Sequence, residues 1–271
     1  MKKAIILISI LFTFTGCAKA QLNGWFFVGD NALYNKLVSV WELDETSGVI
    51  AYDSYGSINL ANVGTTVNQS GKIGKSYLFS GGTDYLTRVY VADELAPKNL
   101  YSFSVWVKIP TGINYDTYCI MARGWRPIAD PYTNRGAIHS FELEYVYGYM
   151  YFKFHYTDSN YVLTTTSASL TYVTYVDEWI HFVCTRDSDT ITIYVNGATN
   201  GSVSGGNGDL LDDEYTYNGI DIFGAYYEPD GTREYNFSGY LDQMAVWSKV
   251  LTATEIAQLY NSGSGLAYMN W

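Results

Sequence analysis

The sequence has little cysteine and little charge, and each shortage excludes a class of protein. Three cysteines in 271 residues exclude a small disulfide-stabilised scaffold. Charged residues make up 16% of the chain and hydrophobic residues 48%, which excludes a disordered polyelectrolyte. The basic residues are the scarcer kind, with 16 Lys and Arg against 27 Asp and Glu, and the formal net charge is −11. Because nucleic-acid binding requires basic patches, we expect no nucleic-acid partner.

Long hydrophobic runs are also absent, and a membrane-spanning helix would need roughly 20 apolar residues. The uncharged, mostly apolar run at residues 4–14 has 11 residues and follows a basic start. That pattern is typical of a secretory signal peptide, so residues 1–20 are predicted to be a targeting segment. Two processing routes stay open: cleavage after Ala20, or lipid attachment at Cys17 within a lipoprotein-like box. Both predict an extracellular or cell-surface location, with the membrane reached only through a lipid on Cys17.

Aromatic residues are abundant, and they predict strands. The chain has 27 Tyr, 12 Phe and 7 Trp, with 25 Gly available for turns and only 5 Pro. Aromatic and β-branched residues favour strands, and alternation of apolar and polar residues places one face of a strand against a core. Strands are predicted at residues 38–43, 101–107, 141–145, 149–156, 179–185, 190–195, 220–224 and 239–247.

One tight turn and one helix are well indicated. Asn196-Gly197 follows an alternating run, and both residue types tolerate the positive φ of a two-residue hairpin turn. Thr252 and Glu255 have capping-box spacing, an apolar stripe follows, and Gly263 is the expected stop. No linker or repeat divides the rest of the chain. We therefore expect one domain of two packed antiparallel sheets at residues 37–271, preceded by an extension at residues 21–36.

Several sequence fragments carry a family resemblance. They are residues 41–48 (WELDETSG), 71–85 (GKIGKSYLFSGGTDY), 101–108, 178–184 with 193–197, and 237–247 with 251–256. In this order, across residues 37–263, they resemble the LamG-like jelly rolls of the concanavalin A-like lectin/glucanase superfamily. The resemblance implies an all-β, two-sheet antiparallel jelly-roll sandwich with one short C-terminal helix. It does not imply an activity, because this fold carries lectins, adhesion modules, enzymes and virion decoration domains.

Two carboxylates give the enzyme hypothesis its only candidates. Glu142 and Glu144 alternate on one strand, so their Cα atoms are about 7 Å apart on the same face. A retaining glycosidase needs carboxyl groups roughly 5–5.5 Å apart, and this spacing is compatible. However, Tyr147 stands where the related glucanases carry a third acid. We therefore expect no catalytic site, with a glycoside hydrolase as an alternative. His181 is expected to pack in the core.

Loops and strands rich in Tyr, Trp and Arg are the candidate ligand sites. Aromatic rings stack on the CH faces of sugars, while Arg, Asn and Asp bond their hydroxyl groups. An outer sheet surface on which the tyrosines bind nothing is the alternative for each cluster. The predicted ligand-binding residues are Tyr115, Tyr118, Trp125, Arg126, Tyr149, Tyr151, Tyr226, Tyr227 and Arg233.

Calcium is an expectation drawn from the resemblance. Asp44, Asp84 and Asp242 stand at positions that are rich in acid in the family, and calcium needs several oxygen ligands. Acidic turns that bind no metal are the alternative, since Asp is an ordinary turn former. A disulfide between Cys119 and Cys184 also stays open.

The sequence as a whole predicts a secreted or surface-attached, non-catalytic module. Its expected partner is a glycan or another extracellular or cell-surface protein. A structural, virion-surface or filament subunit built from the same sandwich is the alternative, and oligomer formation stays open.

Overall fold

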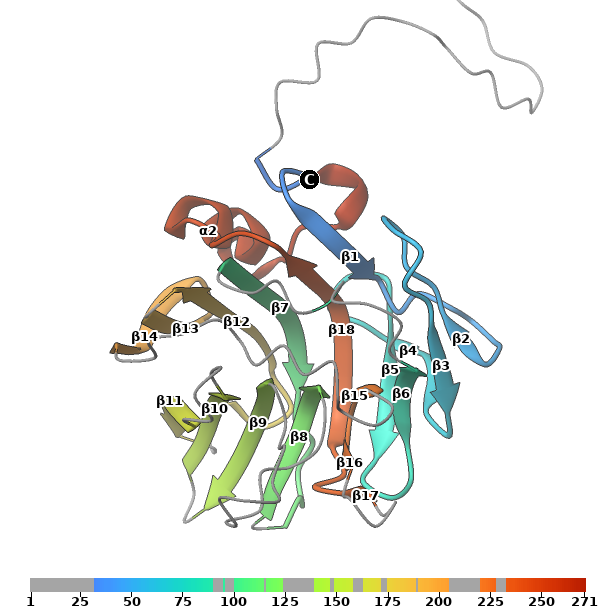
Figure 1. Ribbon diagram of the computed structural model, residues 1–271. Coiled ribbons are helices and arrows are strands. Elements are labelled where there is room, and N and C mark those ends of the chain that lie inside the picture. Colours follow the sequence, from blue (N-terminus) through green and yellow to red (C-terminus); the bar gives the residue numbers. More distant parts are fainter. Residues whose placement is uncertain are drawn as a thin grey trace, which may run out of the picture. The chain divides into compact units, whose positions relative to one another are not determined.

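The computed structural model describes residues 32–89, 95, 100–114, 116–123, 139–146, 149–157, 163–171, 175–188, 190–204, 220–227 and 233–271. In this part of the chain, two large antiparallel sheets pack against each other, with the short helix α2 (Ala253–Tyr260) at the C-terminal end (Figure 1). The predicted two-sheet antiparallel sandwich is confirmed. No helix in the described ranges is both long and apolar enough to span a bilayer.

The first sheet, sheet A, has the strand order β14-β13-β12-β7-β18-β5-β4, and β1 also pairs with β18. Its central strands are among those that the alternation predicted. The bounds are β1 (Leu37–Trp41), β4 (Thr66–Ser70), β5 (Lys75–Ser80), β7 (Leu100–Lys108), β12 (Trp179–Asp187), β13 (Thr190–Val195), β14 (Ala198–Ser204) and β18 (Ser238–Trp247).

The second sheet, sheet B, has the order β11-β10-β9-β8-β15-β6-β3-β2. Its bounds are β2 (Ile50–Ala51), β3 (Leu60–Val63), β6 (Tyr85–Val89), β8 (Asp116–Arg123), β9 (His139–Val146), β10 (Tyr149–Thr157), β11 (Leu163–Thr171) and β15 (Ile220–Phe223). A separate pair joins β16 (Tyr226–Tyr227) to β17 (Arg233–Glu234).

The main core lies between the two sheets. Phe103, Val105 and Val107 project into it from β7, as their alternation predicts, and Ile120 and Phe223 contribute from sheet B. Trp41 has no exposed surface and meets Phe223 edge-on, with 5.3 Å between the ring centroids. Burial of such large aromatic side chains supplies the main driving force that holds two sheets together.

The outer face of sheet A is covered as well. A second apolar cluster includes Val40, Trp247, Ile256, Leu259 and Trp271, and it joins β1, β18 and α2 to the end of the chain. Leu33 belongs to this cluster, so the sandwich includes residues that precede the predicted domain start at residue 37. The outer face of β7 is also buried, which alternation alone did not predict: the Ser102 hydroxyl donates to the Lys249 carbonyl, and Trp106 stacks on Tyr260 of α2.

The local signals at the turn and the helix are confirmed in detail. Asn196 and Gly197 both have positive φ, 51° and 79°, in the two-residue turn between β13 and β14. Thr252 and Glu255 form the complete capping box at the start of α2. The helix ends at Tyr260, earlier than the predicted stop at Gly263, because Asn261 takes the left-handed conformation with φ 48°.

Candidate functional site

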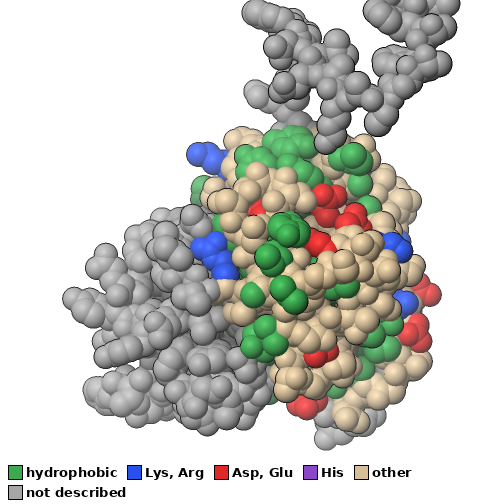
Figure 2. Space-filling model, turned by 90° about the vertical axis from the view of Figure 1, so that its right-hand side faces the viewer, with side chains coloured by type: hydrophobic (Ala, Val, Ile, Leu, Met, Phe, Trp, Pro, Cys, Tyr) green, Lys and Arg blue, Asp and Glu red, His purple; other side chains and the backbone are tan. Residues whose placement is uncertain are grey.

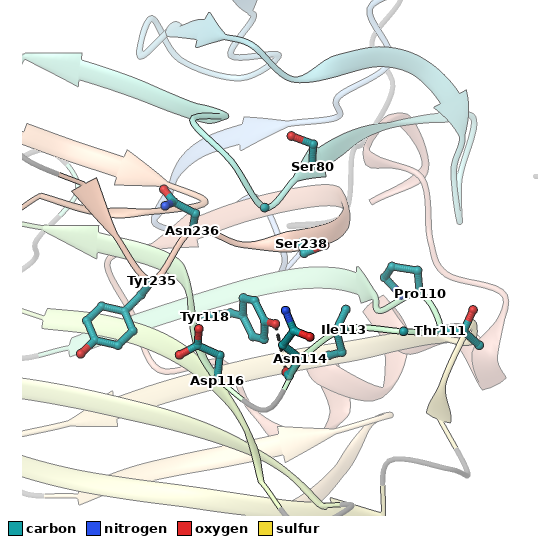
Figure 3. Close-up of a pocket in the computed structure, with 12 residues that line it drawn as sticks. Ser80, Pro110, Thr111, Ile113, Asn114, Asp116, Tyr118, Tyr235, Asn236 and Ser238 are labelled. Atoms are coloured by element: carbon teal, nitrogen blue, oxygen red, sulfur yellow. Dashed lines mark hydrogen bonds between the residues drawn. The ribbon is translucent and has the colours of Figure 1, made fainter.

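A polar pocket lies at the end of the sandwich opposite α2, since Ser238 begins β18 and Trp247, at the other end of that strand, leads toward the helix. Its volume is about 310 Å³. Three segments build it: the β5–β6 turn, the loop from β7 into β8, and the chain that leads into β18 (Figure 3). The lining residues are Ser80, Gly81, Pro110, Thr111, Gly112, Ile113, Asn114, Asp116, Tyr118, Tyr235, Asn236 and Ser238.

The β5–β6 turn forms one wall because Asp84 folds it back on itself. Asp84 accepts a hydrogen bond from the Ser80 amide at 2.7 Å between its Oδ2 atom and the nitrogen. Gly81 has a φ of 79°, and a Cβ atom there would come within 3.0 Å of the Ser238 Cβ. Glycine therefore allows the turn to approach the beginning of β18 closely.

The β7–β8 loop forms the second wall. Pro110 follows the end of β7 and offers no amide to continue the ladder. Beyond it, the Tyr118 hydroxyl donates to the Asn114 carbonyl at 3.1 Å, and the Thr117 amide donates to Asp116 Oδ1 at 2.8 Å. These bonds from residues of β8 hold the end of the loop, so Asn114 and Asp116 have defined positions at the pocket.

The third wall contains a strained residue. Tyr235 has a φ of 53°, a left-handed conformation that costs about 1–2 kcal/mol for a residue with a Cβ. Its carbonyl accepts from the Cys119 amide at 2.7 Å, and Phe237 donates its amide to the Gly224 carbonyl at 2.8 Å. Between these two anchors, Asn236 has a buried side-chain oxygen with no hydrogen-bond partner. A buried acceptor without a partner is unfavourable, which adds to the strain of this segment.

The chemistry of the pocket is that of uncharged hydrogen bonding. Hydroxyls from Ser80, Thr111 and Ser238 line it together with the amides of Asn114 and Asn236. Asp116 is the carboxylate among the lining residues, and no Lys or Arg is found among them in the described chain. Hydroxyl, amide and aromatic groups in a concave site suit a polyhydroxylated ligand.

The predicted ligand residues divide into several groups. Tyr118 lines the pocket. Tyr115, Trp125 and Arg126 lie outside the described residues. Tyr226, Tyr227 and Arg233 lie in the β16–β17 pair, which leads directly to Tyr235, but their side chains are not described. Sequence reasoning missed Ser80, Thr111, Asn236 and Ser238, because no local motif distinguishes these lining residues.

Tyr149 and Tyr151 lie on β10 with 6.4 Å between their ring centroids, and 47% of the Tyr149 surface is exposed. Met150, next to Tyr149, pairs with Tyr145, which pairs with Asp116 across β8 and β9. The tyrosines are therefore at the same end of sheet B as the pocket, two strands away. Their role as ligand contacts stays a prediction.

The carboxylates of the glycosidase alternative have a defined backbone register. Glu142 pairs with Lys153 on β10 and with Cys119 on β8, and Glu144 pairs with Tyr151. Tyr147, at the position of the third acid, lies outside the described residues.

His181 packs, as expected. It is stacked on Trp106 with 4.8 Å between ring centroids, and its Nε2 atom lies 2.9 Å from the Ser104 hydroxyl. Burial lowers the pKa of His181 to about 3, so the ring is neutral. His181 is 1% exposed and Ser104 is 3% exposed, which closes this Ser–His pair to any substrate.

Cys119 and Cys184 are both buried and free, so they form no disulfide with each other.

The three aspartates predicted to bind metal serve two separate turns. Asp44 accepts from the Lys75 amide and Asp242 from the Ile73 amide, so both hold the turn between β4 and β5. Asp84 holds the β5–β6 turn instead. Among the residues with described positions, no three His, Cys, Asp or Glu side chains gather as a metal site. Calcium binding at Asp44, Asp84 or Asp242 stays a prediction.

Asp242 should make stability depend on pH. Burial raises the pKa of its carboxyl well above the usual value, the Ile73 amide opposes that rise, and the Asp44 charge adds to it. A raised folded-state pKa gives stability that is complete below the unfolded pKa of about 4 and is lost as pH rises through the folded pKa. Relative to Asp242→Asn, the wild type should therefore lose unfolding free energy between pH 4.5 and pH 8.

Urea unfolding of both proteins at the two pH values measures this difference. Asp187→Asn is the control, because Asp187 is exposed at the end of β12. If the difference in unfolding free energy between wild type and Asp242→Asn were the same at both pH values, the prediction would be wrong.

Another exposed feature is an apolar patch at the β2 edge of sheet B. Val49, Ile50, Tyr52, Tyr55 and Val63 are the exposed hydrophobic residues of this region, and Figure 2 shows hydrophobic side chains on the face that includes it. Patches of this kind often mark contacts with other molecules. Oligomer formation stays a prediction.

The fold is a two-sheet antiparallel jelly-roll sandwich. The chain belongs to the concanavalin A-like lectin/glucanases superfamily, because the Laminin_G_3 family model of that superfamily matches residues 80–257. No curated protein is detectably similar to the chain.

Solved structures share the fold at low sequence identity. A botulinum neurotoxin serotype D binding domain is 15% identical with a TM-score of 0.57, and the match covers 84% of this chain and 51% of that one. A botulinum neurotoxin DC binding domain in complex with SialylT is 14% identical with a TM-score of 0.59, and the match covers 84% of this chain and 52% of that one. The chain thus spans about half the length of these structures.

Proposed function

We propose that the protein is a non-catalytic module that binds carbohydrate in the end pocket and works outside the cytoplasm. The observation that carries the proposal is a pocket of about 310 Å³ whose lining combines hydroxyl, amide and aromatic groups. A sugar hydroxyl can donate to one polar group of such a lining and accept from another at the same time. Tyr118 and Tyr235 add aromatic surface to the lining.

Three further observations support the proposal. The family includes lectins by its own description. The similar structures are neurotoxin binding domains, one of them in complex with SialylT. The signal-like segment at residues 1–20 supports export. Each of these agrees with a recognition role, for which the pocket is our candidate location.

Asn236→Ala should weaken carbohydrate binding about three- to tenfold. Losing one neutral hydrogen bond costs about 0.5–1.5 kcal/mol, which corresponds to that change in Kd. A glycan array, read with calcium and with EDTA, first identifies the ligand and tests calcium dependence. Calorimetry then compares wild type with the variant.

Asn200→Ala is the matched control, since Asn200 is exposed on β14, at the edge of sheet A farthest from β5 and β4. Binding to no glycan in either buffer, or unchanged affinity in Asn236→Ala, would refute the end pocket as a carbohydrate site. Release of reducing sugar that is abolished by Glu144→Gln would refute the non-catalytic part.

A further inference from the structure

We infer that the end pocket selects uncharged sugars and discriminates against acidic ones, such as sialylated, sulfated or uronic acid glycans. This inference rests on the proposed function and names the ligand class of the same site. It depends on charge at the pocket, which the fold fixes independently of the identity of the sugar.

The first argument is the charge of the lining. Asp116 is exposed at the beginning of β8, with its carboxylate fixed by the Thr117 amide. The other polar side chains of the lining are hydroxyls and carboxamides, which carry no charge. An anionic ligand would therefore meet a like charge, and no lining cation in the described part of the chain offsets it.

The second argument is the charge around the lining. Asp84 is 8% exposed and holds Ser80 in place, so a second carboxylate lies directly behind the β5–β6 wall. Lys108 ends β7 two residues before Pro110, but its ammonium nitrogen lies over the Tyr240 ring, 5.0 Å from the centroid. The net charge of −11 adds a long-range repulsion of anions.

The experiment measures the affinity ratio within matched pairs. Probes are neutral di- and trisaccharides, each paired with its sialylated, sulfated or uronic acid counterpart, in 20 mM and 300 mM NaCl. Wild type should bind each acidic probe at least tenfold more weakly than its neutral counterpart in 20 mM NaCl. The ratio should shrink in 300 mM NaCl, where screening shortens the range of charge interactions.

Asp116→Asn removes the charge and keeps the oxygen that accepts from Thr117. We expect it to reduce the neutral-to-acidic ratio to less than threefold. Asp187→Asn makes the same change in net charge at the opposite end of β7, since Asp187 pairs with Leu100, and should leave the ratio unchanged.

The outcomes separate the inference from the proposed function. Equal or tighter binding of the acidic probes overturns the inference while leaving carbohydrate binding intact. A ratio that Asp116→Asn does not change also overturns it. Binding of neither probe class overturns both.

Discussion

Replacing Asp53 with alanine should lower the free energy of unfolding by about 3 kcal/mol, because one carboxylate holds a whole loop. Its Oδ1 atom accepts from the amides of Val40, Tyr55 and Gly56, and its Oδ2 atom accepts from the Ser39 hydroxyl and the Ile58 amide. The distances are 2.7–3.0 Å. Alanine leaves these donors without their acceptor, and donors that stay buried incur a desolvation cost.

Asp53→Asn is the matched variant. It keeps one acceptor oxygen and should cost roughly half as much as alanine, since charge-assisted bonds are about twice as strong as neutral ones. Urea unfolding of the three proteins gives the comparison. The loop would not depend on this carboxylate if both variants lost the same unfolding free energy, or if Asp53→Ala lost less than about 1 kcal/mol.

Trp247→Ala should lower the free energy of unfolding by about 3–5 kcal/mol. Trp247 has no exposed surface, it stacks on Trp271 with 5.4 Å between ring centroids, and its indole nitrogen donates to the Leu33 carbonyl at 2.7 Å. The substitution removes the centre of the second cluster, where β1, β18, α2 and the chain end meet.

Trp247→Phe separates the ring from the hydrogen bond. It keeps most of the packing and should cost about 1–2 kcal/mol. Thermal and urea unfolding measure both variants, and ligand titration of the folded fraction should give wild-type affinity, since Trp247 and Ser238 are at opposite ends of β18. If Trp247→Ala were as stable as Trp247→Phe, the aromatic ring of Trp247 would not be central to the second cluster.

The fold was largely predictable because short local sequence patterns indicate most of its strands. Alternation placed Phe103, Val105 and Val107 on the core face, and two short signals gave the turn at Asn196-Gly197 and the start of α2. The second cluster was not predictable, since it depends on residues as distant as Leu33 and Trp271 meeting on the outer face of a sheet.

The pocket was predictable only in part. The polar cluster around Tyr118 was visible because its members are neighbours in sequence. Asn236 and Ser80 were not, since each becomes a lining residue only when its segment packs against another. For Asp44 and Asp242, the same acidic pattern that suggested calcium also serves to accept backbone amides, and a sequence does not distinguish these uses.

The separation of the pocket from the far end of β18 has a practical consequence for biosensors. Met269 is 80% exposed in the short helical turn at residues 268–270, while Cys119 and Cys184 are buried. A thiol introduced by Met269→Cys would therefore be the reactive one of these three. Coupling it to a chip or bead would leave the pocket facing the sample rather than the support.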